Sequence, residues 1–236
     1  MHIQETSVEI DRIYSQLSKK DIRSVAITSA NSGEGVTSIA MALAQRSLLA
    51  GYSTLLIDLN LYHPSIKAVI NLDETVSKPN LFNKPELVYL DNTSIVVIGI
   101  PAPSERASRM KLREHGVLEQ HIKEWQKSFD RVIIDTSPLN KVNANNIAPE
   151  RVAAACDGCL VVVLAGSTTE SMFVSAIDKL RSTSVTIIGT IFNDRDNPSL
   201  KNELIRESRR LKPLLNSLAN YLESWLLKNR FLDLEL

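Results

Sequence analysis

Short apolar runs alternate with amphipathic segments along most of this chain. The apolar runs are rich in β-branched residues and predict six buried strands, at residues 24–28, 54–57, 94–98, 131–135, 160–164 and 185–189. Segments with apolar residues three or four positions apart predict five helices, at residues 8–17, 37–50, 117–129, 145–155 and 170–180. This alternation predicts an α/β fold with a doubly wound, mostly parallel sheet that helices cover on both faces.

Two stretches fall outside this pattern. Residues 73–93 hold Pro79 and Pro85 and show no clear period, so we expect a loop or an irregular excursion there. The tail, residues 200–236, predicts two helices that break near Pro213. One face of the second helix is apolar, and it could dock on the domain, bind a partner or lie on a membrane surface.

The strands point to a ligand site at one edge of the sheet. In open parallel sheets, ligands bind at the carboxyl ends of the strands. Asp58 and Asp135 each stand at such an end, and the glycine-containing loop Ser29–Ser38 follows the first strand and precedes a helix. Strand, loop and helix in this order are the context of a phosphate-binding P-loop.

The loop departs from the general P-loop motif at two positions. Gly33 and Gly35 allow the backbone to approach a phosphate closely, and Thr37 could supply a hydroxyl to Mg²⁺. Ala30 stands where the motif has its first glycine, and Val36 stands where it has lysine. We therefore expect residues 1–236 to form one P-loop NTPase domain that contains a deviant Walker A loop. Its N-terminal helix would lie within residues 1–20.

Composition narrows the function classes. Basic and acidic residues number 27 each, so the charge gives no reason to expect a nucleic-acid partner. The longest apolar run, residues 159–166, is far shorter than the roughly 20 residues of a spanning helix. The first 20 residues contain no apolar signal core. We expect a cytoplasmic protein, which a partner or a surface helix could hold at the inner face of the membrane.

Cys156 and Cys159 have the spacing of a redox pair or of half a zinc site. A structural zinc site needs four ligands, and the chain has no second cysteine pair. We therefore interpret both as small buried residues and expect no structural metal.

The motifs, taken in order, resemble those of the bacterial tyrosine kinases, the capsular and exopolysaccharide autokinases related to the ParA/MinD ATPases. The resemblance spans about residues 5–195. Its segments are S-A-N-S-G-E-G-V-T-S at 29–38, L-L-I-D-L-N-L-Y-H-P at 55–64, P-A-P-S-E-R-A-S-R-M at 101–110, F-D-R-V-I-I-D-T-S-P at 129–138, C-D-G-C-L-V-V-V at 156–163 and I-I-G-T-I-F-N at 187–193.

The departures from the family are also specific. Val36 replaces the phosphate lysine, Asn60 the second aspartate of D-x-D, and Tyr62 the arginine that follows it. The N-terminal oligomerisation motif E-x-x-R-x-x-R appears with Ser15 in its last position. The C-terminal tyrosine cluster is absent, since the last 30 residues hold only Tyr221. In phosphoryl transfer, removal of one charge-stabilising group commonly costs about 3–4 kcal/mol.

The resemblance implies residues for each role. Asp58 and Asp135 would be the residual catalytic groups, and Thr37 would join them at a Mg²⁺ ion. Asn193 would neighbour the adenine of a bound nucleotide. The expected nucleotide-binding residues are Asn31, Ser32, Gly33, Glu34, Gly35, Val36, Thr37, Ser38 and Asn193. The ligand would be Mg-ATP or Mg-ADP, held weakly because Val36 offers no charge.

Three functions fit the sequence. The first is a catalytically impaired regulatory or interaction subunit in exopolysaccharide or capsule synthesis and export. Its partner would be a membrane co-polymerase or an intact kinase or ATPase paralogue, and it could also form a homo-oligomer. The second is an active ATPase or tyrosine autokinase with relocated catalytic groups, for which Lys67 and Lys141 are candidates. The third is a MinD-like spatial organiser that the C-terminal helix holds at the membrane.

Overall fold

The structure is a computed structural model and describes residues 7–69, 82, 84–90, 96–141, 143, 146–195, 204, 208 and 224–226. Its helices are α1 (Val8–Lys19), α2 (Val36–Leu49), α3 (Arg106–Lys111), α4 (Val117–Ser128), α5 (Pro149–Ala155) and α6 (Glu170–Arg181). Its strands are β1 (Ser24–Ser29), β2 (Thr54–Leu59), β3 (Ile66–Ala68), β4 (Glu86–Leu90), β5 (Val96–Ile100), β6 (Arg131–Thr136), β7 (Gly158–Leu164) and β8 (Ile187–Asn193).

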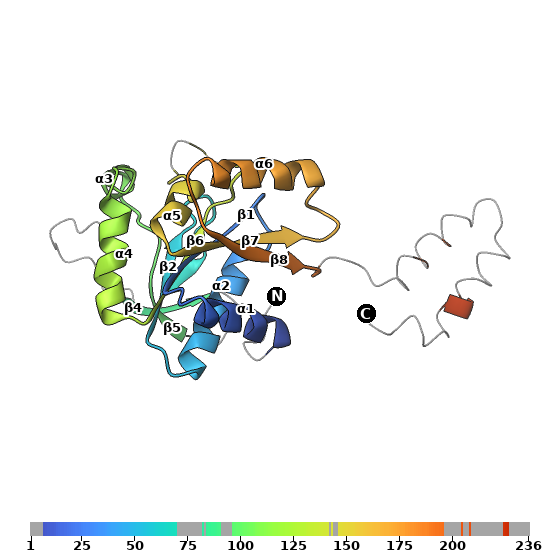
Figure 1. The fold of residues 1–236 in the computed structure, drawn as a ribbon, viewed down its shortest axis with the longest axis horizontal. Helices are drawn as coiled ribbons and strands as arrows, with labels where there is room; N and C mark the ends of the chain where they lie inside the picture. Colours follow the sequence, from blue (N-terminus) through green and yellow to red (C-terminus); the bar gives the residue numbers. More distant parts are fainter. Residues whose placement is uncertain are drawn as a thin grey trace. The chain divides into compact units, whose positions relative to one another are not determined.

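The strands form one sheet in the order β3-β4-β5-β2-β6-β1-β7-β8. The six strands from β5 to β8 in this order pair in parallel, whereas β3 and β4 pair antiparallel at one edge. Figure 1 shows α1 and α2 on one face of the sheet, with α4, α5 and α6 on the other. The predicted doubly wound, mostly parallel α/β fold is confirmed.

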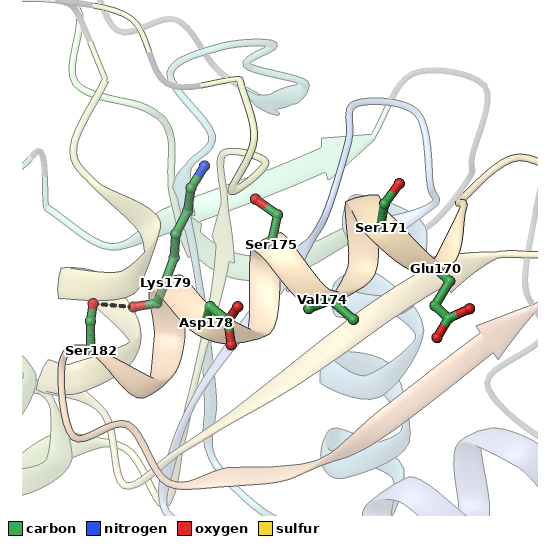
Figure 2. Close-up of a pocket in the computed structure, with 7 residues that line it drawn as sticks. All are labelled: Glu170, Ser171, Val174, Ser175, Asp178, Lys179 and Ser182. Carbon is green, nitrogen blue, oxygen red and sulfur yellow. Dashed lines mark hydrogen bonds between the residues drawn. The ribbon is translucent and has the colours of Figure 1, made fainter.

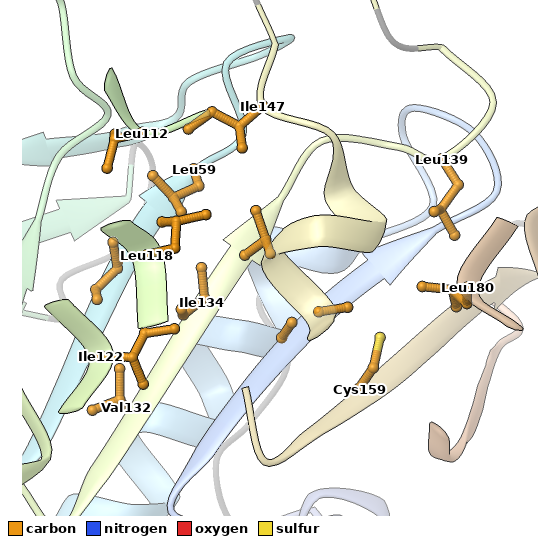
Figure 3. Packing of buried hydrophobic residues seen from close by; sticks show 14 of the residues in the cluster. Leu59, Leu112, Leu118, Ile122, Val132, Ile134, Leu139, Ile147, Cys159 and Leu180 are labelled. Carbon is orange, nitrogen blue, oxygen red and sulfur yellow. The ribbon is translucent and has the colours of Figure 1, made fainter. Parts of the chain in front are cut away.

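Strand alternation divides the core into two apolar clusters, one on each face. In β2, Leu55 and Ile57 belong to the cluster under α4, α5 and α6, and Leu56 belongs to the cluster under α1 and α2. Figure 3 shows part of the first cluster, in which side chains of α4 lie against Val132 and Ile134 of β6. Because the central strands are buried on both faces, each contains a continuous apolar run, Val25–Ile27 in β1, Leu55–Ile57 in β2 and Val132–Ile134 in β6.

Three short elements were not predicted from the sequence: β3, β4 and α3. Strand β4 lies inside residues 73–93, for which we expected a loop or an irregular excursion, so that expectation was wrong for Glu86–Leu90. Pro85 directly precedes this strand, and only Val88 of its five residues is buried. A short strand with one buried residue lacks the apolar run on which the prediction relied. Residues 73–81, 83 and 91–93 lie outside the described residues.

Three predicted boundaries also move. The helix expected at 145–155 begins at Pro149, because a residue before proline is disfavoured from the helical region and proline fits the first helical position. Strand β8 runs from Ile187 to Asn193 rather than over 185–189, because its pairing with β7 continues to Asn193. The strand expected at 94–98 is found as Val96–Ile100, where it pairs with β2.

Contacts along the chain define two units, residues 1–193 and residues 194–236. In the second unit, Leu204, Ser208 and Ser224–Leu226 are helical, and the predicted break near Pro213 lies outside the described residues. Within the described ranges, none of the helices combines the length and the apolar character that crossing a bilayer requires.

The two cysteines are free thiols: Cys156 is the C-cap of α5 and is only partly buried, so the expectation of two buried cysteines holds for Cys159 of β7 and not for Cys156. Cys159 is fully buried, and this burial raises the pKa of its thiol to about 12. Burial, together with Cys159 and Asp157, also raises the pKa of the Cys156 thiol. Because the thiolate is the reactive form, these raised pKa values disfavour reaction of both thiols at neutral pH.

Candidate phosphate and metal site

The loop between β1 and α2 has the backbone shape of an anion-binding loop. Gly33 and Gly35 have φ angles of 87° and 99°, a region that side-chain-bearing residues avoid. The first bond within α2 joins the Ile39 N–H to the Gly35 carbonyl at 3.1 Å. The amides of the first turn of α2 therefore have no acceptor within the helix, and together with the helix dipole they suit a phosphate group.

The side chains of the loop divide by exposure. Ser32 is exposed, and Asn31, Thr37 and Ser38 are partly buried. Glu34 is only 2% exposed, because its carboxylate folds back into the loop. The predicted contribution of Glu34 to nucleotide binding would thus come from its backbone.

Val36 is the first residue of α2 and is 7% exposed. It belongs to the apolar cluster on the α2 face of the sheet, together with Ile39 and Val162. The position at which the general motif carries a phosphate-binding lysine is therefore part of the hydrophobic core in this chain.

The two acidic residues predicted from the sequence lie side by side. Asp58 of β2 and Asp135 of β6 are register partners on adjacent strands, and neither side chain is exposed. Thr37 donates its hydroxyl proton to Oδ2 of Asp135 at 2.6 Å. The structure thus brings together the three residues expected at a metal ion.

Burial governs the protonation of this pair. It raises the pKa of Asp58 to about 6, against the opposing hydrogen bonds from the backbone amides of Ile66, Asn60 and Ser65. Burial and the neighbouring Asp58 charge raise the pKa of Asp135 well above its ordinary value. Among the described residues, the Thr37 hydroxyl is the one group that opposes this rise.

The donor set fits a hard divalent cation. Oδ1 of Asp135 is buried and has no hydrogen-bond partner among the described residues. Thr37 keeps oxygen lone pairs free while it donates its proton, and carboxylate and hydroxyl oxygens are ligands that Mg²⁺ prefers. In the described part of the chain, no group of three His, Cys, Asp or Glu residues is arranged to hold a metal ion. A Mg²⁺ ion here would therefore depend on Thr37 and on ligands from a bound phosphate or water.

Asn60 and Tyr62 shape the turn that follows β2. The Asn60 amide donates to Asp58 at 2.8 Å, and its side-chain oxygen accepts from the His63 amide at 3.1 Å. The Tyr62 amide donates to the Ser137 hydroxyl at 3.3 Å, and the Tyr62 ring packs edge-on against His63. The two residues that depart from the family motif thus have local roles in this turn.

Lys67 and Lys141, the candidates to replace the missing phosphate lysine, lie in different parts of the structure. Lys67 is exposed on β3, next to Ile66, whose amide bonds to Asp58. Lys141 is exposed beyond the end of β6.

Helix α6 and the turn before it contribute hydrogen bonds from residues that the sequence pattern did not indicate, Lys179 and Thr168. Lys179 donates to the Leu139 carbonyl at 2.8 Å and to the Asn140 side chain at 3.1 Å. Asn140 in turn bonds through its amide to the Ala30 carbonyl. Thr168, in the turn before α6, donates to Glu34. The rule that ligands gather at the carboxyl ends of strands could have indicated Thr168, because it follows β7 by four residues.

An open depression lies along the surface of α6 (Figure 2). Its lining residues are Glu170, Ser171, Val174, Ser175, Asp178, Lys179 and Ser182. All of them come from α6 and its C-cap, so the depression is a feature of the helix surface and not of the phosphate loop.

Asn193, the last residue of β8, reaches the loop. Its side-chain amide donates to the Glu34 carbonyl at 2.9 Å. A Cβ atom on Gly35 would lie 2.5 Å from Nδ2 of Asn193, whereas a Cβ on Gly33 would meet nothing within 4 Å. The residue expected near an adenine is thus packed on the loop backbone itself.

This difference between the two glycines predicts unequal costs of substitution. Gly33→Ala should lower the free energy of unfolding by about 1–2 kcal/mol, because both glycines have positive φ. Gly35→Ala should cost about 1 kcal/mol more, since its methyl group displaces Asn193 from Glu34. Urea unfolding measures both values, and Asn193→Ala should remove the excess. Equal costs for the two glycines, or an excess that persists in the Asn193→Ala background, would contradict this account.

Comparison with known proteins finds similarity to proteins named tyrosine-protein kinases. No protein-family model matches the chain. Tyrosine-protein kinase CpsD of Streptococcus pneumoniae is 27% identical over 189 residues, covering 77% of this chain and 80% of CpsD. Tyrosine-protein kinase YwqD of Bacillus subtilis (strain 168) is 27% identical over 185 residues, covering 75% of this chain and 74% of YwqD.

Solved structures share the fold. The chimerical protein CapA2B2 superposes with a TM-score of 0.61 at 19% identity, over 78% of this chain and 82% of that one. The septum site-determining protein MinD of Pyrococcus horikoshii, solved with Mg-ADP, superposes with a TM-score of 0.54 at 16% identity, over 75% and 72%. Sheet, loop and neighbours define a domain of the P-loop NTPase fold. The chain is a homologue of the bacterial tyrosine kinases.

Proposed function

We propose that this chain is a catalytically impaired relative of the bacterial tyrosine kinases that acts as a regulatory or interaction subunit. The resemblance puts its setting in exopolysaccharide or capsule synthesis and export. Its partner would be a membrane co-polymerase or an intact kinase paralogue, at the inner face of the membrane.

One observation is the main support for the proposed loss of catalysis. The position of the phosphate lysine is occupied by Val36, and that side chain is buried in the core. Phosphoryl transfer depends mainly on positioning and on neutralising charge at the transferred group. A buried valine provides neither a cation nor a hydrogen bond to a β- or γ-phosphate. Removal of one such group commonly lowers a rate by two to three orders of magnitude.

Nucleotide binding would persist in a weakened form. The amides of the first turn of α2 remain available to a phosphate, and Thr37 stays next to Asp135. These two residues, with Asp58, would hold Mg²⁺. When bound, the ion would neutralise phosphate charge. The MinD structure of the same fold is a complex with Mg-ADP, which supports this ligand class.

Helix α1 offers a surface for assembly. The positions of the family's oligomerisation motif, Glu9, Arg12 and Ser15, are all exposed. The opposite side of α1 packs on α2, where the Arg46 guanidinium lies 4.4 Å from the Tyr14 ring centroid and pairs with Asp11. The exposed side is therefore free of the packing that fixes the helix. With Ser15 in place of arginine, we expect self-assembly to be weaker than in an intact family member.

The test is incubation of the purified protein with Mg-ATP, followed by intact-mass measurement and by an assay of phosphate release. We expect no added phosphoryl mass and at most background hydrolysis, with no further loss in Thr37→Ala. Hydrolysis well above background that Thr37→Ala abolishes would overturn the proposal.

An active autokinase is the second candidate, favoured by one observation. Among the described residues, Oδ1 of Asp135 has no hydrogen-bond partner and Oδ2 accepts from the Thr37 hydroxyl, which supports a retained cation site. This candidate requires a phosphotyrosine in the incubated protein. A mass increase of one phosphoryl group that maps to a tyrosine would establish it in place of the first.

A further inference from the structure

Glu34 is the central residue of the phosphate loop, and its side chain is tied to three groups. Its carboxylate accepts hydrogen bonds from the Ala30 amide at 3.1 Å, from Asn31 Nδ2 at 3.1 Å and from the Thr168 hydroxyl at 2.7 Å. Burying a carboxylate is costly unless it is hydrogen-bonded, and here all three partners are donors. The buried charge is therefore accommodated by the loop and by the turn before α6.

The Thr168 hydroxyl both donates and accepts a hydrogen bond in this arrangement. Its hydroxyl donates to Glu34 and accepts from the Leu164 amide at 3.1 Å, at the end of β7. The Glu34 carbonyl accepts from Asn193 at the end of β8. One loop residue is thus held at both its side chain and its backbone by the two neighbouring strand ends.

A loop that contains two glycines needs contacts that fix its conformation. Gly33 and Gly35, on either side of Glu34, both have positive φ angles, and glycine loses the most conformational freedom on ordering. In this chain no lysine from position 36 can draw the loop around a phosphate. The curved shape must therefore come from contacts inside the protein.

We propose that Glu34 and Thr168 are positioning residues that hold the phosphate loop in its curved shape when no ligand is bound. The role rests on the proposed function insofar as the loop receives a phosphate, but the contact itself requires no nucleotide. The carboxylate points toward the start of the loop and the turn before α6. In this position its charge is satisfied by donors instead of competing with a phosphate for the α2 amides.

The test compares variants that leave the charge of the loop unchanged. Thr168→Val keeps the shape of the side chain and removes the hydroxyl, whereas Thr168→Ser keeps the hydroxyl. We expect amide hydrogen exchange of residues 30–38 to be about tenfold faster in Thr168→Val, since a hydrogen bond of this kind contributes about that factor. Thr168→Ser should exchange at the wild-type rate.

Two further variants keep the result interpretable. Thr169 is the N-cap of α6 and bonds to the Met172 amide, so Thr169→Val should speed exchange at the start of α6 and leave the loop unchanged. If Thr168→Val does not fold, Glu34→Gln, which places an amide opposite these donors, should show the faster loop exchange. Wild-type exchange in the variant that folds, equal acceleration in Thr168→Ser, or equal loop acceleration in Thr169→Val would each overturn the proposal.

Adding Mg-ADP separates this inference from the proposed function. Protection of residues 30–38 by Mg-ADP in the wild type would support nucleotide binding. If Mg-ADP changes nothing while Thr168→Val still loosens the loop, the positioning role stands and the nucleotide-site part of the proposed function fails.

Discussion

Replacing Val36 with lysine is expected to raise the affinity for Mg-ADP and Mg-ATP by about ten- to a hundredfold. The new ammonium group would lie at the first position of α2, where it could reach a phosphate held by the helix amides. Hydrogen bonds to charged groups contribute about 1.5–3 kcal/mol, which corresponds to this range of affinity. The lysine stem can replace part of the valine packing while its charged end reaches the loop.

Calorimetric titration measures this effect, and Val36→Met is the matched control. Methionine is long and unbranched but carries no charge, so its affinity should remain that of the wild type. Turnover should stay low in Val36→Lys, because Asn60 and Tyr62 still occupy the positions of the family's aspartate and arginine. Equal affinity for the lysine and methionine variants would show that the missing charge is not what weakens the site.

The buried Asp58–Asp135 pair is expected to make the protein less stable as the pH rises. Both pKa values are raised in the folded state, so the folded protein binds more protons than the unfolded chain above about pH 4. The free energy of unfolding must then fall with increasing pH. For Asp58, a rise from 3.8 to about 6 corresponds to a loss on the order of 3 kcal/mol across that interval. The contribution of Asp135 extends the decline to higher pH.

Urea unfolding between pH 5 and 8 tests this, with Asp135→Asn as the control. Asparagine can still accept the Thr37 proton, and it removes the charge that acts on Asp58. The variant should be more stable than the wild type at pH 8 and should lose less stability across the range. His121, whose pKa burial lowers, acts in the opposite direction but is common to both proteins and cancels in the difference. Parallel pH profiles for the two proteins would contradict the prediction.

Addition of Mg²⁺ should reduce the same pH dependence. A cation between the two aspartates favours their charged forms, so it lowers both pKa values and restores stability at high pH. Asp135→Asn should respond less to Mg²⁺ than the wild type. An equal response in both proteins would place the ion elsewhere.

Local sequence pattern determined the central part of this protein. The strands β1, β2, β6 and β7 are buried on both faces, so their apolar runs show directly in the sequence. The order of motifs along the chain also indicated the phosphate loop and the two aspartates. For Asp58 and Asp135, the rule that parallel strands end at one edge of the sheet was enough to predict that they meet.

Tertiary structure alone decided what surrounds these residues. The sequence shows Val36 as a missing lysine, and only packing shows that its side chain is part of the core. Glu34 reads as a loop residue open to a nucleotide, yet Thr168, 134 positions further along the chain, holds its carboxylate inside the loop. Such contacts cannot be predicted from local pattern, because they depend on which strand ends become neighbours when the sheet assembles. The short strands β3 and β4 were missed for a related reason, since pairing stabilises them, β3 with β4 and β4 with β5, rather than a run of apolar residues.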